Sequence, residues 1–333
     1  MSTASYRRMR PEDRAAVIQL WSQIFETPEA YQAERLAGDP DADEHTYVAV
    51  APDGMVVSAL HTLRTRRCDA DGSPRLVGEI DSVATRTEAR RQGHAERLLL
   101  LALAELEQAG CDWSLLVTTE MGRPLYQRHG WRPFPEPWRR GSVVGAPPAQ
   151  AAAYQVGPLD PQAEPEAWRR IAAVDTAFNQ GRPLTVVRDA NYWQGYAAAR
   201  VGNWITSEGL VVFAATRPGT PGLCGYALAE FYPSAFQIRD LAVLPAEPDA
   251  LPALLHAVAQ ESQRRGAPPV ARLFLPREPW IDAAVEHLFG ATLQHGHVQG
   301  SLMARAIGPR FSEAQLDALF AAPGAIFSSI DLF

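Results

Sequence analysis

A basic, glycine-containing turn in the first third of the chain carries the residues best suited to hold an anion. Residues 76–85 read as a strand and residues 96–109 as a helix, so this turn leads into a helix N-terminus. That end of a helix presents unpaired N–H groups and a partial positive charge. Gly93 lets the backbone approach a ligand closely, and Arg90 and Arg91 add full charges. The turn is therefore a candidate phosphate site, the alternative being a solvated basic turn.

Two carboxylates lie in the strand that leads into the turn. Side chains alternate between the two faces of a strand, so every second residue shares one face. That face is expected to hold Val77, Glu79, Asp81, Val83 and Thr85. A carboxylate in an otherwise apolar strand is costly to bury unless it is paired or functional. Glu79 and Asp81 are therefore either candidate general bases or salt-bridge partners, for example of Arg64 or Arg66 on the preceding strand.

The segments around the turn predict one unit of strands and helices. Further strands are expected at residues 6–9, 46–50, 55–66, 111–118 and 131–134. The helix after the turn is apolar nearly all round at residues 97–103, so we expect it to be covered on most sides. A short helix at 122–129 carries Leu125 and Tyr126 and ends at Gly130.

Composition and charge exclude several classes of protein. The chain has 333 residues, of which 47% are hydrophobic, enough for two globular domains. A formal charge of −7 argues against a general nucleic-acid role. Cys68, Cys111 and Cys224 have no metal-binding spacing and fit reduced thiols in a cytoplasmic protein. Neither a metal site nor a membrane segment is expected.

The order of elements repeats in outline after residues 145–153, whose composition is typical of a linker. Helices are expected at 166–178, 251–264 and 281–288, and strands at 210–215, 225–231, 237–245 and 270–275. The turn after Val243 has two prolines and the acidic Glu247 and Asp249, but no glycine or arginine. Prolines lack N–H donors and the acids would repel a phosphate, so this second turn is not expected to bind an anion.

Two segments of the first half resemble motifs of the GNAT superfamily of N-acetyltransferases. Residues 90–95 (R-R-Q-G-H-A) match the pyrophosphate-loop pattern [QR]-x-x-G-x-[GA], and residues 125–131 (L-Y-Q-R-H-G-W) are similar to the signature L-Y-x-x-x-G-F. The resemblance covers residues 6–140, and the second half resembles the degenerate copy of tandem acetyltransferases. It implies an α/β (α+β) fold with two acyl-CoA N-acyltransferase-like domains, each a mixed, mostly antiparallel sheet flanked by helices.

The resemblance also implies roles for individual residues. Acetyl-CoA would be the co-substrate, with its pyrophosphate held by Arg90, Arg91, Gln92, Gly93, His94 and Ala95, and its pantetheine arm beside Val83 and Thr85. Tyr126 matches the family's general acid, which protonates the leaving thiolate. Glu79 matches the position of a glutamate base in some members, with Asp81 and His61 as alternatives. Thr119 stands where many members carry asparagine, which puts one contact to the pantetheine in doubt.

The last residues are also informative. Residues 312–320 read as an amphipathic helix, and residues 325–333 are apolar, which suggests that this tail docks into the fold. Some tandem acetyltransferases place a terminal phenylalanine carboxylate in the active site, so the resemblance makes Phe333 a further candidate base. The alternative is that the tail completes a core.

We therefore expect an N-acetyltransferase that uses acetyl-CoA and acts on a primary amine of a small molecule, such as an amino acid, a polyamine or an aminoglycoside. The alternatives are a CoA-binding sensor without turnover and a protein-lysine acetyltransferase. A homo-oligomer is compatible with the sequence. The expected division is a catalytic domain at 1–143, a linker at 144–156, a degenerate domain at 157–308, and a C-terminal helix and tail at 309–333.

Overall fold

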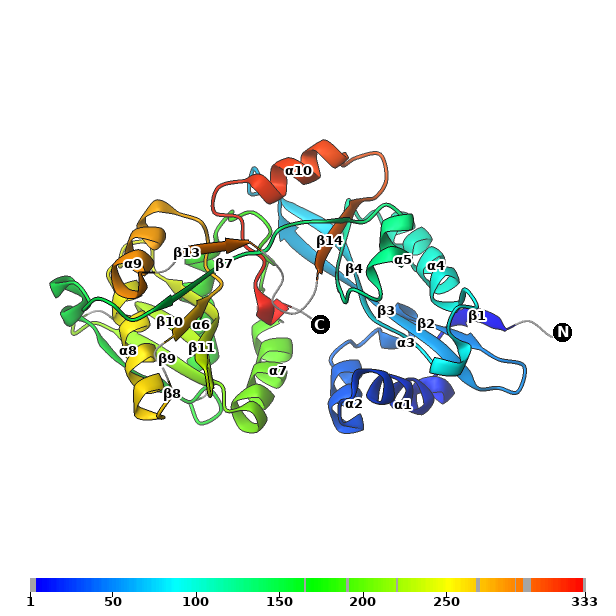
Figure 1. Ribbon diagram of the computed structural model, residues 1–333, viewed down its shortest axis with the longest axis horizontal. Coiled ribbons are helices and arrows are strands. Elements are labelled where there is room, and N and C mark those ends of the chain that lie inside the picture. The colour runs from blue at the N-terminus through cyan, green and yellow to red at the C-terminus, as the bar shows by residue number, and fades with distance from the viewer. Residues whose placement is uncertain are drawn as a thin grey trace.

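The structure is a computed structural model that describes residues 4–164, 166–189, 192–219, 221–267, 270–290, 292–295 and 301–331. These residues form two lobes, each built on a seven-stranded sheet (Figure 1). The strand orders are β1-β2-β3-β4-β5-β14-β6 and β13-β7-β12-β11-β10-β9-β8. Both sheets are antiparallel except for the parallel pairs β4–β5 and β11–β12. The expected fold class, two mixed and mostly antiparallel sheets with helices, is confirmed.

The first sheet has helices on both faces. Its strands are β1 (Ser5–Arg8), β2 (Thr46–Val50), β3 (Val56–Cys68), β4 (Pro74–Thr85), β5 (Trp113–Thr118), β6 (Arg132–Pro133) and β14 (Ser301–Ala306). Its helices are α1 (Arg14–Phe25), α2 (Glu29–Ala37), α3 (Ala42–His45), α4 (His94–Gln108) and α5 (Arg123–Arg128), with α10 (Glu313–Ala321) beside β14. The α4 side and the α1 side of the sheet have separate apolar cores.

The second sheet has one large core. Its strands are β7 (Pro137–Ser142), β8 (Gln155–Leu159), β9 (Val211–Thr216), β10 (Gly225–Tyr232), β11 (Ala235–Val243), β12 (Val270–Leu273) and β13 (Thr292–His295). Its helices are α6 (Ala167–Asn179), α7 (Ala198–Asn203), α8 (Ala250–Arg264) and α9 (Pro279–Phe289). Two π-helical segments, Tyr192–Ala197 and Trp204–Glu208, flank α7. Short 3-10 turns span Pro11–Asp13, Thr87–Ala89, Ala149–Ala153 and Ser329–Asp331.

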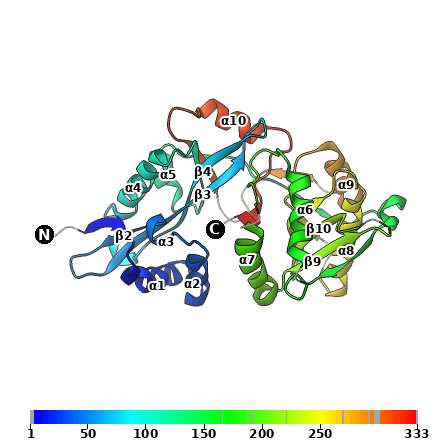
Figure 2. The same cartoon turned by 180° about the vertical axis from the view of Figure 1, so that it is seen from behind.

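The two halves of the chain exchange strands. β7 joins the second sheet between β12 and β13, and β14 joins the first sheet between β5 and β6. Figure 1 shows β7 and β14 in these lobes, and Figure 2 shows the two lobes from behind. The boundaries expected at residues 143 and 308 therefore do not follow the sheets, because each lobe contains a strand from beyond its boundary. The chain crosses between the sheets at residues 134–136, and the expected linker, 144–156, already includes the start of β8.

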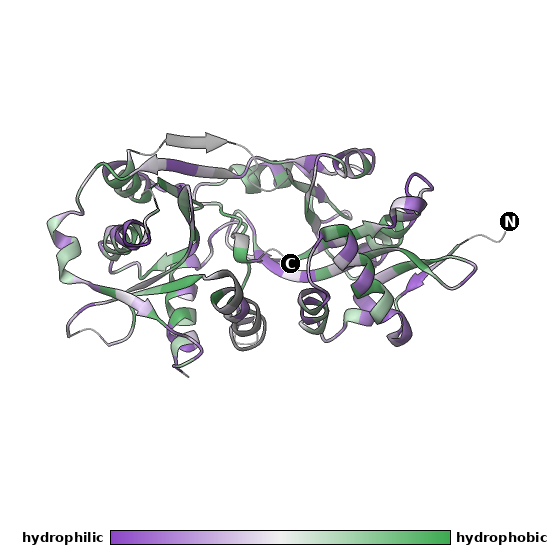
Figure 3. Cartoon of the chain, turned by 60° about the horizontal axis from the view of Figure 1, so that its bottom comes forward, coloured by the Kyte–Doolittle hydropathy of each residue, from purple (hydrophilic) through white to green (hydrophobic). Residues whose placement is uncertain are grey.

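α4 is covered on one side only. Leu98, Leu99 and Ala102 are buried against the sheet, whereas Leu100 and Leu101 are 47% and 40% exposed. The expectation that this helix is covered on most sides was therefore wrong. Helices of both lobes carry hydrophobic and hydrophilic residues side by side along their length (Figure 3). No helix in the described part of the chain has the length and hydropathy needed to cross a membrane.

Candidate functional site

β4 and β5 separate where the resemblance expects the pantetheine arm. Their parallel pairing covers only residues 77–79 and 113–115. β4 continues to Thr85 and β5 to Thr118, and these described residues have no further pairing with each other. Backbone groups that face such an opening can pair with an extended ligand.

A β-bulge in β4 changes the predicted faces of this strand. Ser82 has a φ of +49°, and Ser82 and Val83 together lie opposite the single residue Leu60 of β3. Beyond the bulge, Val83 packs in the core under α4, whereas Ala84 packs on the α1 side. The prediction that Val83 shares a face with Asp81 was therefore wrong, because the extra residue reverses the alternation.

The basic turn leads into α4 with left-handed backbone at two positions. Arg91 has a φ of +63° and Gly93 a φ of +81°, and α4 begins at His94. A side chain at Gly93 would meet no atom within 4 Å, so its conformation, not space, favours glycine there. Arg90 donates from Nε to the carbonyl oxygen of Thr85 at 3.3 Å. The exposed turn and the first N–H groups of α4 fit a phosphate group.

Tyr126 projects from α5 into the core beside this opening. Its side chain is 6% exposed, and its ring meets that of Trp131 edge-on at 6.1 Å. Its hydroxyl makes no hydrogen bond to any described residue. Burial, together with the charge of Asp81, raises the pKa of Tyr126 well above its usual value. The phenol is therefore protonated at neutral pH and free to donate.

A cleft of about 620 Å³ lies between the lobes. Asp81, Ser82 and His61 line it from the first sheet, and Tyr31, Arg35 and Asp39 from α2 and the residues after it. The second lobe contributes Val186, Tyr192, Gly195, Asn203 and Trp204. The second half thus forms one wall of the cleft, to which Tyr192 and Gly195 of the first π-helical segment contribute.

Asp81 is the carboxylate of β4 that faces the cleft. Its Oδ2 accepts hydrogen bonds from Arg35 Nη2 at 2.6 Å and from Ser82 Oγ at 2.9 Å. The Asp81 side chain is 22% exposed and that of Arg35 is 18% exposed. The negative charge of Asp81 helps to raise the pKa of Tyr126, so the cleft carboxylate acts electrostatically on the candidate acid.

Glu79 lies on the same strand but outside the cleft lining. Its Oε1 accepts hydrogen bonds from Arg67 Nε at 3.0 Å and from Thr65 Oγ1 at 2.5 Å. Arg67 also donates to the carbonyl oxygen of Leu184 at 2.9 Å. Burial raises the pKa of Glu79, although the Arg67 charge opposes this. The structure thus gives Glu79 a buried ion pair, with Arg67 rather than Arg64 or Arg66.

His61 is buried beside Asp81 at the floor of the cleft. Its Nδ1 lies 2.9 Å from Thr46 Oγ1, and its Nε2 lies 3.5 Å from Asp39 Oδ2. Burial lowers the pKa of His61 to about 4, although Asp81 and Asp39 oppose this. The ring is therefore neutral at neutral pH. Burial raises the pKa of Asp39, but the hydrogen bond from His45 lowers it overall, so Asp39 is an anion.

Phe333, the remaining candidate base, lies outside the described residues. The segment before it does dock into the fold: Phe327, Ile330 and Asp331 are 6%, 0% and 0% exposed. Asp331 Oδ1 accepts a hydrogen bond at 2.7 Å from the hydroxyl of Tyr192, which lines the cleft.

The second lobe has the same strand arrangement but a different turn. β11 and β12 pair over residues 236–238 and 271–273 and then separate. Glu247, in the turn before α8, accepts hydrogen bonds from Tyr154 and Arg217. The hydrogen bond from Tyr154 lowers the pKa of Glu247 despite some burial, so this side chain is a carboxylate anion. This turn does not suit a phosphate.

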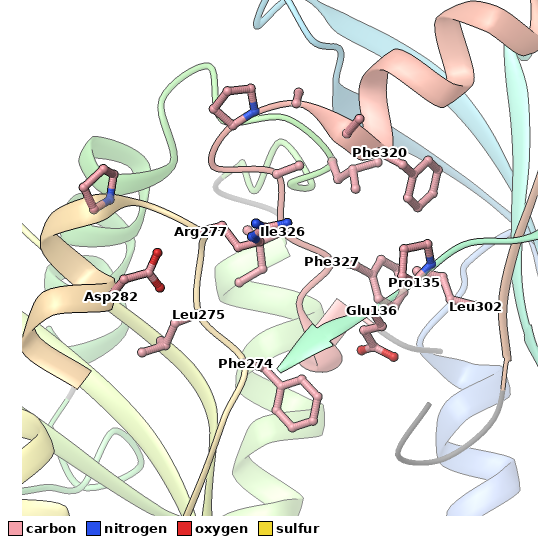
Figure 4. A pocket seen from close by; sticks show the side chains of 16 residues that line it. Pro135, Glu136, Phe274, Leu275, Arg277, Asp282, Leu302, Phe320, Ile326 and Phe327 are labelled. Carbon is pink, nitrogen blue, oxygen red and sulfur yellow. The ribbon is translucent and has the colours of Figure 1, made fainter. Parts of the chain in front are cut away.

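A second cavity of about 360 Å³ lies at the junction of the lobes, away from the turn. Glu136, at the crossing between β6 and β7, lies between Phe274 and Phe327 there (Figure 4). Burial raises the pKa of Glu136 to about 7. The residues that line this cavity include neither Asp81 nor His61, both of which line the larger cleft.

The residues of α2 were missed by the sequence reasoning. Tyr31 and Arg35 are one helical turn apart on α2, and Asp39 follows its end. A proline before the helix, an acidic residue in its first turn and Gly38 after it are helix-boundary signals that could have indicated it.

Comparisons with known proteins agree with this geometry. Residues 5–134 match the family described as the acetyltransferase (GNAT) domain. Among solved structures, a probable N-acyltransferase from Enterococcus faecalis V583 has a TM-score of 0.68 at 16% identity, covering 92% of this chain and 72% of that one. A GCN5-related N-acetyltransferase from Anabaena variabilis has 0.67 at 16%, covering 92% and 73%.

Eis1 from Mycobacterium abscessus is also similar, with a TM-score of 0.62 at 16% identity, covering 91% of this chain and 73% of that one. The chain has no match among curated proteins. These structures show that the chain has the fold of GNAT acyltransferases, and residues 5–134 match the model of the acetyltransferase (GNAT) domain.

Proposed function

We propose that this GNAT acyltransferase transfers the acetyl group of acetyl-CoA to a primary amine of a small molecule. One observation carries the proposal: the opening between β4 and β5 lies between the basic turn at 90–95, the buried phenol of Tyr126 and the cleft lined by Asp81. A cleft walled by the second lobe supports a small acceptor over a lysine on a protein surface.

The turn and the strand opening suit the two ends of acetyl-CoA. The N–H groups at the start of α4 and the positive charge of Arg90 and Arg91 would hold the pyrophosphate. The backbone of Val83 and Thr85 would pair with the pantetheine arm, because β5 leaves that edge of β4 open. The thioester would then lie at the bulge, beside the cleft.

The residues around the cleft can complete the proton transfers of the reaction. Asp81, or neutral His61 beside it, would accept the proton that the ammonium must lose before its nitrogen attacks. A backbone N–H near Val83 would stabilise the negative charge on the carbonyl oxygen. Tyr126 would donate its proton to the CoA sulfur as the thioester bond breaks. Phe333 stays a candidate for the first proton transfer.

The test is thiol release from acetyl-CoA by the purified full chain with amino acids, polyamines and aminoglycosides. We expect thiol release that depends on the amine and an acetylated amine as its product. Release no faster than acetyl-CoA hydrolysis with every amine would contradict the proposal. Tight CoA binding in that case would support a sensor.

A further inference from the structure

The C-terminal segment 327–331 joins the two lobes through two buried guanidiniums. Phe327 lies over Arg67 of the first sheet, with the Arg67 Cζ 4.9 Å from the ring centre. Asp331 accepts hydrogen bonds from Nε and Nη2 of Arg188 at 3.1 and 3.0 Å. Arg188 belongs to the second lobe, just before the first π-helical segment. This segment therefore spans from one lobe to the other.

The single positive charge of Arg188 is surrounded by three carboxylates. Besides Asp331, its guanidinium contacts Asp175 of α6 at 2.7 Å and Asp240 of β11 at 3.1 Å. Tyr226 donates a hydrogen bond to Asp240 at 2.6 Å. All three carboxylates are buried, so without the guanidinium they would repel one another in a medium of low dielectric. Arg188 is the group that holds α6, β11 and the C-terminal segment together.

The same cluster reaches the cleft through Tyr192. The Tyr192 hydroxyl donates to Asp331 Oδ1 at 2.7 Å, and its ring centre lies 5.4 Å from the Arg188 Cζ. Tyr192 lines the cleft from the lobe that faces Asp81. The place of this cleft wall is thus fixed by contacts to Arg188 and to the C-terminal segment, not by the first lobe alone.

We propose that Arg188 is a positioning residue for the acceptor amine. It holds Tyr192 and Asp331 in place, and so sets how the cleft wall faces Asp81. Arg188 is buried against the Tyr192 ring and does not line the cleft, so its guanidinium would contact neither substrate. The inference rests on the proposed function in one respect, that this cleft receives the amine. The turn at 90–95 is on the other lobe, so acetyl-CoA binding does not depend on Arg188.

The test uses two conservative variants and one control. Arg188→Lys keeps the charge but loses the forked contacts, and Tyr192→Phe removes only the hydroxyl that bonds Asp331. Arg139→Lys is the matched control: Arg139 is also buried in the second sheet and bonded to an aspartate, Asp282, but it lies outside the cleft lining. Initial rates are measured with the amine and acetyl-CoA varied separately, together with melting temperatures.

A displacement of about an ångström can cost up to about a hundredfold in rate, so we expect kcat/KM for the amine to fall about tenfold in Arg188→Lys, with a rise in the amine KM. We expect a smaller rise in Tyr192→Phe and an unchanged acetyl-CoA KM in both. Arg139→Lys should lower the melting temperature without changing either KM. An unchanged amine KM in both test variants, or equal rises for both substrates, overturns the inference.

Hydrogen exchange of the amides at 327–331 separates this inference from the proposed function. If the wild-type protein acetylates no amine, the proposed function fails, but Arg188→Lys should still speed exchange in this segment more than Arg139→Lys does. Equal exchange in the two variants would overturn the role of Arg188.

Discussion

Replacing the two carboxylates of β4 one at a time should separate chemistry from folding. Asp81→Asn removes the charge that faces the cleft. Asp81 and its partner Arg35 are 22% and 18% exposed, so water partly screens the pair, and we expect it to contribute on the order of 1 kcal/mol to stability. Loss of a general base costs about 10²- to 10⁴-fold in rate. We expect kcat/KM to fall by that amount with the melting temperature nearly unchanged.

Glu79→Gln should have the opposite effect. The side chains of Glu79 and Arg67 are 8% and 0% exposed, so the substitution leaves a guanidinium buried without its counter-charge. Breaking such a pair costs about 3–5 kcal/mol, which corresponds to a fall in melting temperature on the order of 10 °C. The kcat of the folded fraction should stay within about twofold of wild type, because Glu79 does not line the cleft.

The two variants serve as controls for each other. Thiol release from acetyl-CoA gives the rates, thermal unfolding gives the stability, and the rates are scaled to the folded fraction. The reasoning is refuted if Glu79→Gln abolishes turnover at an unchanged melting temperature while Asp81→Asn keeps wild-type kcat/KM. That result would return Glu79 to the role of base that the family resemblance suggested.

Four further predictions concern single features. Tyr126→Phe should lower kcat about a hundredfold at an unchanged acetyl-CoA KM, and wild-type kcat would exclude Tyr126 as the acid. Gly93→Ala places a side chain at a φ of +81°, a strain of about 1–2 kcal/mol, so acetyl-CoA KM should rise about tenfold; an unchanged KM would contradict the phosphate site. Burial raises the pKa of Asp175 to about 6, with Arg188 opposing, against 3.8 in the unfolded chain. The folded state thus favours the protonated form, and stability on the order of 3 kcal/mol should be lost as pH rises from about 4 to about 6. Asp175→Asn should abolish this loss, as measured by denaturant unfolding at several pH values. Removal of residues 332–333 should slow turnover if Phe333 is the base, and unchanged turnover in a folded protein would exclude it.

Periodic patterns predicted the local elements well. β2 has the bounds expected from the sequence, 46–50, and α4 begins two residues before its expected start at Glu96. In both cases a run of apolar residues marks the element, although Leu100 and Leu101 of α4 are exposed. The basic turn was found because glycine and arginine between a strand and a helix have a direct physical consequence.

The pairing of distant segments could not be predicted in this way. β14 lies beside β5 although almost 200 residues separate them, and nothing in the local pattern of residues 301–306 selects that partner. The bulge at Ser82 was equally hidden, because neither glycine nor proline marks it. A single inserted residue then reversed the face expected for Val83.

The choice between Glu79 and Asp81 shows why a strand pattern alone does not assign a base. Both carboxylates share one face of β4, as alternation predicts, but that face has two different neighbours along its length. Near Glu79 it meets Arg67 and the segment 184–187, which hydrogen-bonds to the end of β3. Near Asp81 it opens on the cleft.

The second lobe explains this difference. Leu184 N and Val187 N donate to the carbonyl oxygens of Cys68 and Arg66, so a strip of the second lobe pairs with the edge of β3. The carbonyl oxygen of Leu184 accepts a hydrogen bond from Arg67, the partner of Glu79. Tyr192 lines the cleft that Asp81 faces, where its hydroxyl bonds to Asp331. Under the proposed function, the half of the chain whose turn lacks glycine and arginine would thus decide which carboxylate of the other half meets the amine.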